Sequence, residues 1–342
     1  RSVLMPVLIA SVALAVAGCS TIRFGYDKLP FLAGWEIDRY LDLASEQEAI
    51  ADRQLRAVQA WHRKAQLPKY AVLLKQIEAE VAQVDAPMTA ERIADWRRAA
   101  LATWPELVDH LAPGVAELAV TLTPAQLDHF EKALAEANRK IETEYFVGKP
   151  AKTLREARIK RSRERAESFL GPLNGPQLAR VAQRADDEGT LATSHWWALR
   201  LPRQRILVEL FRDLASRRPP IDEATARTRT ALLSLVQPTD PVLRARAQAA
   251  EDAGDRYQAG MLAETSVVQR RHLVERLRGY GSDLDRLMAV AAAGGEGGVV
   301  DLAALTTLSA LASLEGAGGP RQVRSPVQSP VRSPVRSPVQ TP

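Results

Sequence analysis

The chain has 342 residues, with 46 lysines and arginines, 41 aspartates and glutamates, and a single cysteine. One cysteine cannot close an intrachain disulfide or build a multi-cysteine zinc or iron–sulfur site, so packing must hold the fold together. Hydrophobic residues make up 46% of the chain and charged residues 25%, which is typical of a globular protein with a core.

The first eighteen residues have the pattern of an export signal. Arg1 precedes sixteen uncharged residues, 3–18, fewer than the roughly 20 apolar residues that a membrane-spanning helix needs. A basic residue, an apolar run of this length and small residues at its end are typical of a signal peptide. We therefore expect residues 1–18 to be a signal that is removed on export.

The apolar run ends in Val16-Ala17-Gly18-Cys19, which resembles the lipobox of bacterial lipoproteins. The resemblance implies that the Cys19 thiol receives a diacylglyceryl group and that the new amino terminus is acylated, with palmitate as a typical chain. In such lipoproteins an aspartate directly after the cysteine retains the protein in the inner membrane. Ser20 stands at this position, so the chain resembles lipoproteins that are sorted to the outer membrane and face the periplasm. Several acyl chains hold a protein stably on a bilayer, since each buried methylene contributes about 0.8 kcal/mol. The alternative is a small buried cysteine in an apolar helix.

Turn residues dominate after the cysteine, and we expect a linker over 19–34. Helical periodicity then predicts an all-helical body over 35–292, and no alternating β-branched run with hairpin turns competes with it. The expected helices, in chain order, cover 45–66, 68–84, 89–111, 123–145, a segment from Asn174, 194–217, 221–236 and 240–292. The predicted fold is an all-α irregular multi-helix bundle or helical array.

Beyond the body, the composition changes twice. Glycines at 294–298 break the last helix, so 293–315 reads as a glycine linker and a short helix. Residues 316–342 repeat Ser-Pro-Val, and a proline every fourth residue predicts an extended, disordered tail. Arg1 and four arginines of this tail account for the whole surplus of basic residues, which leaves 41 basic against 41 acidic residues over 19–315. The basic balance therefore does not predict a nucleic-acid partner.

Three glutamines stand at expected helix starts in the pattern Leu-x-x-x-Gln, namely Gln47, Gln126 and Gln177. In its full form, Leu122-Thr123-x-x-Gln126 is similar to the signature of small periplasmic helical chaperones of the Spy and CpxP type. The simpler interpretation is a capping box, in which the third helical residue satisfies the N-cap amide, and Ser45 with Glu48 forms such a box as well. The unequal spacing does not support a regular solenoid.

Two segments combine aromatic and polar residues, Trp35-Glu36-Ile37-Asp38-Arg39-Tyr40-Leu41-Asp42-Leu43 and Trp61-His62-Arg63-Lys64 with Leu67-Pro68 and Tyr70. With Cys19 and residues 163–177, they resemble an uncharacterised family of proteobacterial lipoproteins of unknown function, over roughly 19–290. The candidate polar or binding residues are Asp38, Tyr40, Asp42, Trp61, His62 and Tyr70. The functional interpretation is that Asp38, Tyr40, Asp42 and His62 converge as a polar site. The alternative is a packed aromatic beside a satisfied imidazole.

A basic stretch runs over 149–165 and includes Lys152, Arg155, Arg158 and Arg161. These residues could bind anionic lipid head groups or peptidoglycan-linked phosphates at a membrane surface. The alternative is a solvated helix face paired with acidic neighbours in the fold.

Signatures of catalysis are missing from the sequence. The five histidines form no His-x-x-x-His pair, no Gly-x-Ser-x-Gly elbow occurs, and the glycine cluster lacks a following Lys-Ser or Lys-Thr. We expect no catalytic residue, metal or cofactor, and a binding or scaffold role on the membrane with an envelope protein, lipid or peptidoglycan as partner. The alternatives are an envelope hydrolase that uses two carboxylates in a helical groove, and a chaperone of the Spy type with an exposed apolar face.

Overall fold

The computed structural model describes residues 26–83 and 87–292. Over these ranges the chain forms helices joined by short turns, with no β-strand, which confirms the predicted all-α class. The helices are α2 (Leu29–Leu41), α3 (Ser45–Ala65), α4 (Leu67–Ala82), α5 (Ala90–Leu101), α6 (Trp104–Ala119), α7 (Pro124–Tyr145), α8 (Ala151–Leu170), α9 (Gly175–Asp187), α10 (His195–Arg217), α11 (Ile221–Ser234), α12 (Pro241–Ala263) and α13 (Val267–Ala292). The predicted signal, Cys19, the glycine linker and the Ser-Pro-Val tail lie outside the described residues.

Three helix starts agree with the sequence because a predicted side chain caps them. Thr123, Asn174 and Ser194 each accept a hydrogen bond from a backbone N–H in the first turn, at the start of α7, α9 and α10. These residues satisfy donors that the helix leaves unpaired, so these three start positions follow from local chemistry. None of the helices in the described ranges combines the length and apolarity needed to cross a bilayer.

The expected linker over 19–34 is wrong in its second part, because α2 begins at Leu29. Pro30 occupies the first turn of this helix, where its fixed φ is favourable and its missing N–H costs nothing. Gly34 lies inside the helix and comes close to α3, with a hypothetical Cβ 3.8 Å from Leu55 Cδ1. The proline and glycine that suggested a linker therefore serve a helix start and a close packing contact.

Helix α3 is capped differently from the prediction. Ala44, not Ser45, is the N-cap, and Ser45 is the first helical residue. The third residue is then Gln47, whose side-chain oxygen accepts the Ala44 N–H at 2.9 Å. Glu48 is consequently not the partner in the capping box.

The expected helix over 89–111 is interrupted. Helix α5 ends at Leu101 and α6 begins at Trp104, with Pro105 in its first turn. A proline disfavours helical backbone at the preceding residue and cannot donate to the previous turn, so the apolar stripe continues across a helix break. The segment 240–292 is likewise divided, by the turn at 264–266 between α12 and α13.

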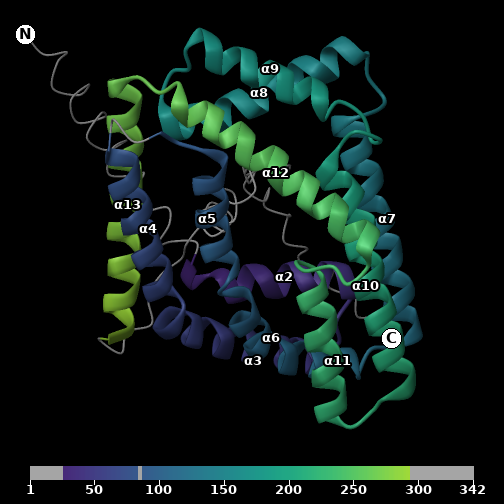
Figure 1. Cartoon of the computed structure of the whole chain (residues 1–342). Coiled ribbons are helices and arrows are strands. Elements are labelled where there is room, and N and C mark those ends of the chain that lie inside the picture. Colours follow the sequence, from purple (N-terminus) through teal and green to yellow (C-terminus); the bar gives the residue numbers. More distant parts are fainter. Residues whose placement is uncertain (1–25, 84–86, 293–342) are drawn as a thin grey trace, which may run out of the picture.

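Figure 1 shows the helices arranged as a frame. Helices α4 and α13 lie side by side along one edge and α7 and α10 along the opposite edge. Helices α8 and α9 pair across one end, while α6 packs on α3 and α11 at the other. Helix α12 runs diagonally across the frame and contacts α5, α9 and α10.

The packing of α2–α7 is repeated by α8–α13. Within the first half α2 packs on α3 and α7, and α3 packs on α6; within the second, α8 packs on α9 and α13, and α9 on α12. Helices of one half also pack against helices of the other half. Helix α4 packs on α13, and its equivalent α10 packs on α7. In the same way α5 packs on α12, and its equivalent α11 packs on α6. The third and fourth helices of each half thus pack partly against the other half, and we expect the body to fold as one unit.

The largest core cluster lies where α4, α5 and α13 meet. Leu67, Leu74, Ile93 and Leu277 in this cluster are at most 2% exposed. Val181 of α9 belongs to the same cluster, so the core reaches from the first half of the chain into the second. Burial of this apolar surface is the main favourable contribution to the stability of the frame.

Candidate functional site

Two pairs of buried glutamines connect helix starts that are distant in the sequence. In the first pair Gln126 Nε2 donates to Gln47 Oε1 at 2.6 Å, and Gln47 Nε2 donates to Gln126 Oε1 at 3.2 Å, across 79 residues. Gln126 Nε2 also donates to the Asp42 carbonyl at 2.8 Å, and Gln47 Nε2 to the Thr121 carbonyl at 3.1 Å. The pair thus joins the starts of α3 and α7 to the turns that precede them.

The second pair has the same design. Gln269 Nε2 donates to Gln177 Oε1 at 2.8 Å, across 92 residues, and to the Pro172 carbonyl at 2.7 Å. Gln177 Nε2 donates to the Met261 carbonyl at 3.1 Å. Gln177 stands at the start of α9 and Gln269 at the start of α13, the equivalents of α3 and α7 in the second half.

The capping interpretation of the Leu-x-x-x-Gln motif is confirmed, with an added tertiary role. Gln126 Oε1 accepts the Thr123 N–H at 3.0 Å and Gln177 Oε1 accepts the Asn174 N–H at 3.0 Å. The side-chain NH₂ group of each glutamine remains available for a partner distant in the sequence. Because this group is buried, it needs a hydrogen-bond acceptor there. The fourth glutamine was missed because Thr265 stands four residues before Gln269, although Ser266-x-x-Gln269 is itself a capping box.

Trp61, His62 and Tyr70 do come together, in a buried polar cluster at the junction of α3 and α4. The Tyr26 hydroxyl lies 2.8 Å from His62 Nδ1 and 3.4 Å from the Gln59 carbonyl. The rings of His62 and Tyr70 pack at 5.7 Å between centroids, and the ring of Trp61 lies 6.3 Å from that of His62. Sequence reasoning missed Tyr26, which precedes the first described helix.

Burial determines the charge state of this cluster. Desolvation lowers the pKa of His62 to about 4 and raises the pKa of Tyr26 and of Tyr70. The imidazole and both phenols are therefore neutral at pH 7. A base held at a pKa of about 4 within a packed cluster serves as a hydrogen-bonding group in the core, in line with the satisfied imidazole that was the alternative interpretation.

A second layer of contacts closes the cluster from outside. The Tyr70 hydroxyl donates to Gln66 Oε1 at 2.6 Å, and Gln66 Nε2 donates to the Thr103 carbonyl at 3.0 Å. Trp61 stacks on His110 of α6 with ring centroids 3.7 Å apart. These contacts tie the α3–α4 junction to the break between α5 and α6 and to α6 itself.

Asp38, Tyr40 and Asp42 lie elsewhere, which corrects the expectation that they converge with His62. They stand at the end of α2, next to the start of α3, whereas His62 is seventeen residues along α3 from Ser45, about 25 Å at the helical rise. The Asp38 carboxylate accepts the Leu43 N–H at 2.9 Å. Each of the three therefore takes part in the turn between α2 and α3 or its packing.

The turn itself explains the other two residues. Asp42 is the C-cap of α2 in the left-handed region, with φ 50°, which aspartate tolerates better than most residues. Its carbonyl accepts the hydrogen bond from Gln126. The Tyr40 ring meets Phe130 edge to face at 6.3 Å and has the Arg39 guanidinium 4.3 Å from its centroid.

The basic stretch forms α8, and three of its four candidate cations bind protein groups. Arg155 makes a two-bond ion pair with Asp186 at 2.6 and 2.8 Å. Arg158 donates to the Ala185 and Tyr145 carbonyls, both at 3.1 Å. Arg161 lies 4.0 Å over the Tyr145 ring, and Lys152 is exposed. These contacts attach α8 to α9 and to the end of α7.

The most buried ion pair joins the two halves of the chain. Arg97 of α5 is 6% exposed and donates to Asp255 of α12 at 2.9 Å and to Glu251 at 2.5 Å. Burial raises the pKa of Glu251, and Arg97 opposes that shift. A hydrolase of the predicted kind would need two carboxylates free in a groove, and these two are both bound to the same guanidinium.

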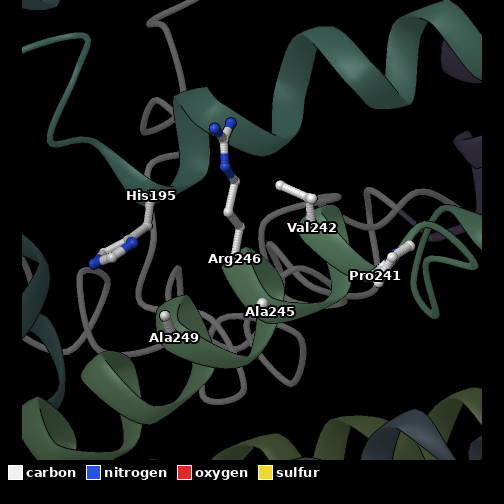
Figure 2. A pocket seen from close by; sticks show the side chains of 6 residues that line it. All are labelled: His195, Pro241, Val242, Ala245, Arg246 and Ala249. Carbon is white, nitrogen blue, oxygen red and sulfur yellow. The ribbon is translucent and has the colours of Figure 1, made fainter.

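Other ligand-binding features are slight in the described part of the chain. No group of three or more histidine, cysteine, aspartate or glutamate residues is placed to hold a metal ion within residues 26–83 and 87–292. A shallow, open hollow lies between His195 at the start of α10 and the first turns of α12, lined there by Val242, Ala245 and Arg246 (Figure 2). Its walls hold few groups that could orient a ligand.

Comparison with protein families gives one match. The model of a family of unknown function, DUF6279, matches residues 39–218, just over half of the chain. The chain belongs to this family. The match runs from the end of α2 to the end of α10 and so contains both members of the first glutamine pair, and of the second pair only Gln177. No curated protein and no solved structure matches the chain.

Proposed function

We propose that this protein of the DUF6279 family is a lipoprotein of the bacterial cell envelope whose helical body acts as a scaffold or binding module. The observation that carries the proposal is Val16-Ala17-Gly18-Cys19, which ends the uncharged run that begins at residue 3 and contains the only cysteine of the chain. An acylated Cys19 would hold the body on a membrane, and Ser20 favours the periplasmic face of the outer membrane.

The packing of the described residues supports a scaffold. Three sets of buried polar groups connect helices to one another, namely the glutamine pairs, the cluster around His62 and the Arg97 ion pairs. Fully partnered polar networks make a fold rigid and specify one arrangement of its helices. A rigid frame of this kind suits a protein that presents a surface to an envelope protein, lipid or peptidoglycan. The balanced charge of residues 19–315 gives no support to nucleic acid as a partner.

The lipid anchor has a direct test. The full chain and its Cys19→Ala variant are expressed in a Gram-negative host, and the mature protein is examined by mass spectrometry and by detergent-phase partitioning. We expect the natural chain to begin at Cys19, to carry acyl chains and to enter the detergent phase. The variant should lack the lipid and stay in the aqueous phase. Processing at the same position and equal partitioning of the variant would refute the anchor.

The binding role is tested with the same membrane-anchored protein. Photocrosslinking in the envelope, followed by recovery of the protein, should yield a defined protein, lipid or glycan partner in place of a broad background. Recovery of no partner under these conditions would contradict the scaffold proposal. Cleavage of purified peptidoglycan or lipid would replace it by a hydrolase, and suppression of aggregation of unfolded clients at near-equal molar ratio would replace it by a chaperone.

A further inference from the structure

Helix α2 leaves large apolar side chains uncovered on one face. Phe31, Leu32 and Trp35 are 68%, 42% and 60% exposed. Phe31 and Trp35 are one helical turn apart and so lie on the same side of α2. Single exposed apolar residues are common on protein surfaces, but neighbouring aromatics on one helix face form a patch, and such patches mark interaction sites.

The opposite face of α2 is held firmly by the body. Pro30 and Leu41 are buried, and Ile37 and Tyr40 pack against the cluster that contains Phe130. At the end of the helix the Gln126 amide binds the carbonyl that follows Leu41. The helix is therefore held against α3 and α7 (Figure 1). Because its other face is buried in this way, the aromatic face has a fixed orientation on the body.

The patch lies close in sequence to the proposed anchor. Six residues separate Cys19 from Tyr26, the first described residue, so seven Cα–Cα steps span at most about 25 Å even when fully extended. An acylated Cys19 would thus keep Tyr26, three residues before the start of α2, within that distance of the bilayer surface. Along α2 the exposed face changes from apolar at Phe31 to charged at the exposed Glu36–Arg39 ion pair.

We propose that α2 is a membrane-docking helix, with Phe31 and Trp35 inserted at the boundary between lipid head groups and acyl chains of the bilayer that holds Cys19. This inference rests on the proposed lipid anchor. Aromatic side chains favour that boundary, and a helix that lies in it buries one apolar face and keeps its polar residues in water. Two contacts, the acyl chains and the α2 face, fix the side of the frame that faces the membrane.

The test uses the full lipidated chain in vesicles of phosphatidylethanolamine and phosphatidylglycerol. Acylation occupies the Cys19 thiol, so Phe31→Cys or Trp35→Cys introduces the one free thiol, which is labelled with an environment-sensitive fluorophore. The matched control is Val268→Cys, an exposed valine (73%) at the start of α13. All three sites are on the surface, and circular dichroism checks that each variant keeps its helices.

We expect labels at 31 and 35 to be blue-shifted, quenched by doxyl-labelled lipids, and at least threefold less accessible to aqueous iodide than the label at 268. Equal iodide access at all three sites, with acylated Cys19, would refute docking and leave the anchor intact. Protection from iodide without quenching by doxyl lipids would show that a protein covers the patch and would also refute it. Two free thiols and no acyl mass in the Phe31→Cys variant would refute the anchor and the docking together.

Discussion

The first glutamine pair makes a quantitative prediction about stability. Replacing Gln126 by methionine keeps the volume of the side chain and removes its amide. The Thr123 N–H and the Asp42 carbonyl then lose their partners, at 3.0 and 2.8 Å, and both bonds to Gln47 are lost. The helix start and the turn before α3 are affected together.

The size of the effect follows from the bonds that cannot be replaced. A net hydrogen bond contributes about 1 kcal/mol, and a buried group left without a partner costs about 1–3 kcal/mol. The Gln47 amide keeps its bonds to Thr121, so the main losses fall on Thr123 and Asp42. We expect Gln126→Met to lower the free energy of unfolding by about 3 kcal/mol. Gln47→Met, which also removes the bond to Ala44, should cost a similar amount.

The assay is urea unfolding followed by far-ultraviolet circular dichroism for the two single variants and the double variant. Since the mutual bonds are counted in both single variants, the double variant should lose less than their sum, with a coupling energy of about 1.5 kcal/mol. The matched control is Gln183→Met, an exposed glutamine of α9 that donates a hydrogen bond to Asp187 in its own helix and should change stability by less than about 0.5 kcal/mol.

Two outcomes would refute this reasoning. If Gln126→Met is no more destabilising than Gln183→Met, the glutamine pair contributes nothing beyond an ordinary surface residue. If the two single effects add fully in the double variant, the bonds between Gln47 and Gln126 carry no energy, and each glutamine acts only on its own helix start.

Three further predictions concern packing, protonation and the ion pair between the halves. Gly114→Ala should destabilise by about 1–2 kcal/mol in urea unfolding, because the added Cβ would lie 2.8 Å from Gln54 Cβ in α3, whereas Gly279→Ala, with nothing within 4 Å, should stabilise by up to about 1 kcal/mol. The pKa of His62 falls from 6.5 to about 4 on folding, so only the unfolded chain binds a proton between these values. Stability should therefore fall by about 3 kcal/mol from pH 6.5 to pH 4, and His62→Leu should remove that part of the slope in unfolding measured across pH. Arg97→Met should cost about 3–5 kcal/mol at pH 7, because it leaves two carboxylates of α12 without their cation. Burial raises the pKa of Glu251, so the loss should shrink at lower pH as Glu251 is protonated, and a loss that does not change with pH would contradict that cause.

Several helix starts could be predicted from the sequence because a side chain caps its own helix, although the start of α13, which Ser266 caps, falls inside the helical pattern over 240–292. Thr123, Asn174 and Ser194 act on N–H groups two or three residues away, so their chemistry is complete within one turn. Leu101 and Trp104 show where this reasoning stops, since the apolar spacing continues through a break that the proline after Trp104 imposes. Periodicity reports which residues are buried and not whether one helix or two bury them.

The sequence by itself determined the all-α class, most helix starts and the capping role of the glutamines, because these depend on residues within one or two turns of each other. Only the tertiary structure decided that Gln47 pairs with Gln126 and that Gln177 pairs with Gln269. A capping box uses the side-chain oxygen of each glutamine and does not specify a partner for its NH₂ group. The tertiary structure also decided that His62 is buried with Tyr26, that Asp38 and Asp42 stand at the other end of α3, and that α2 turns its aromatic face outward. These outcomes depend on how helices pack across 30 to 90 residues, and local chemistry carries no information at that range.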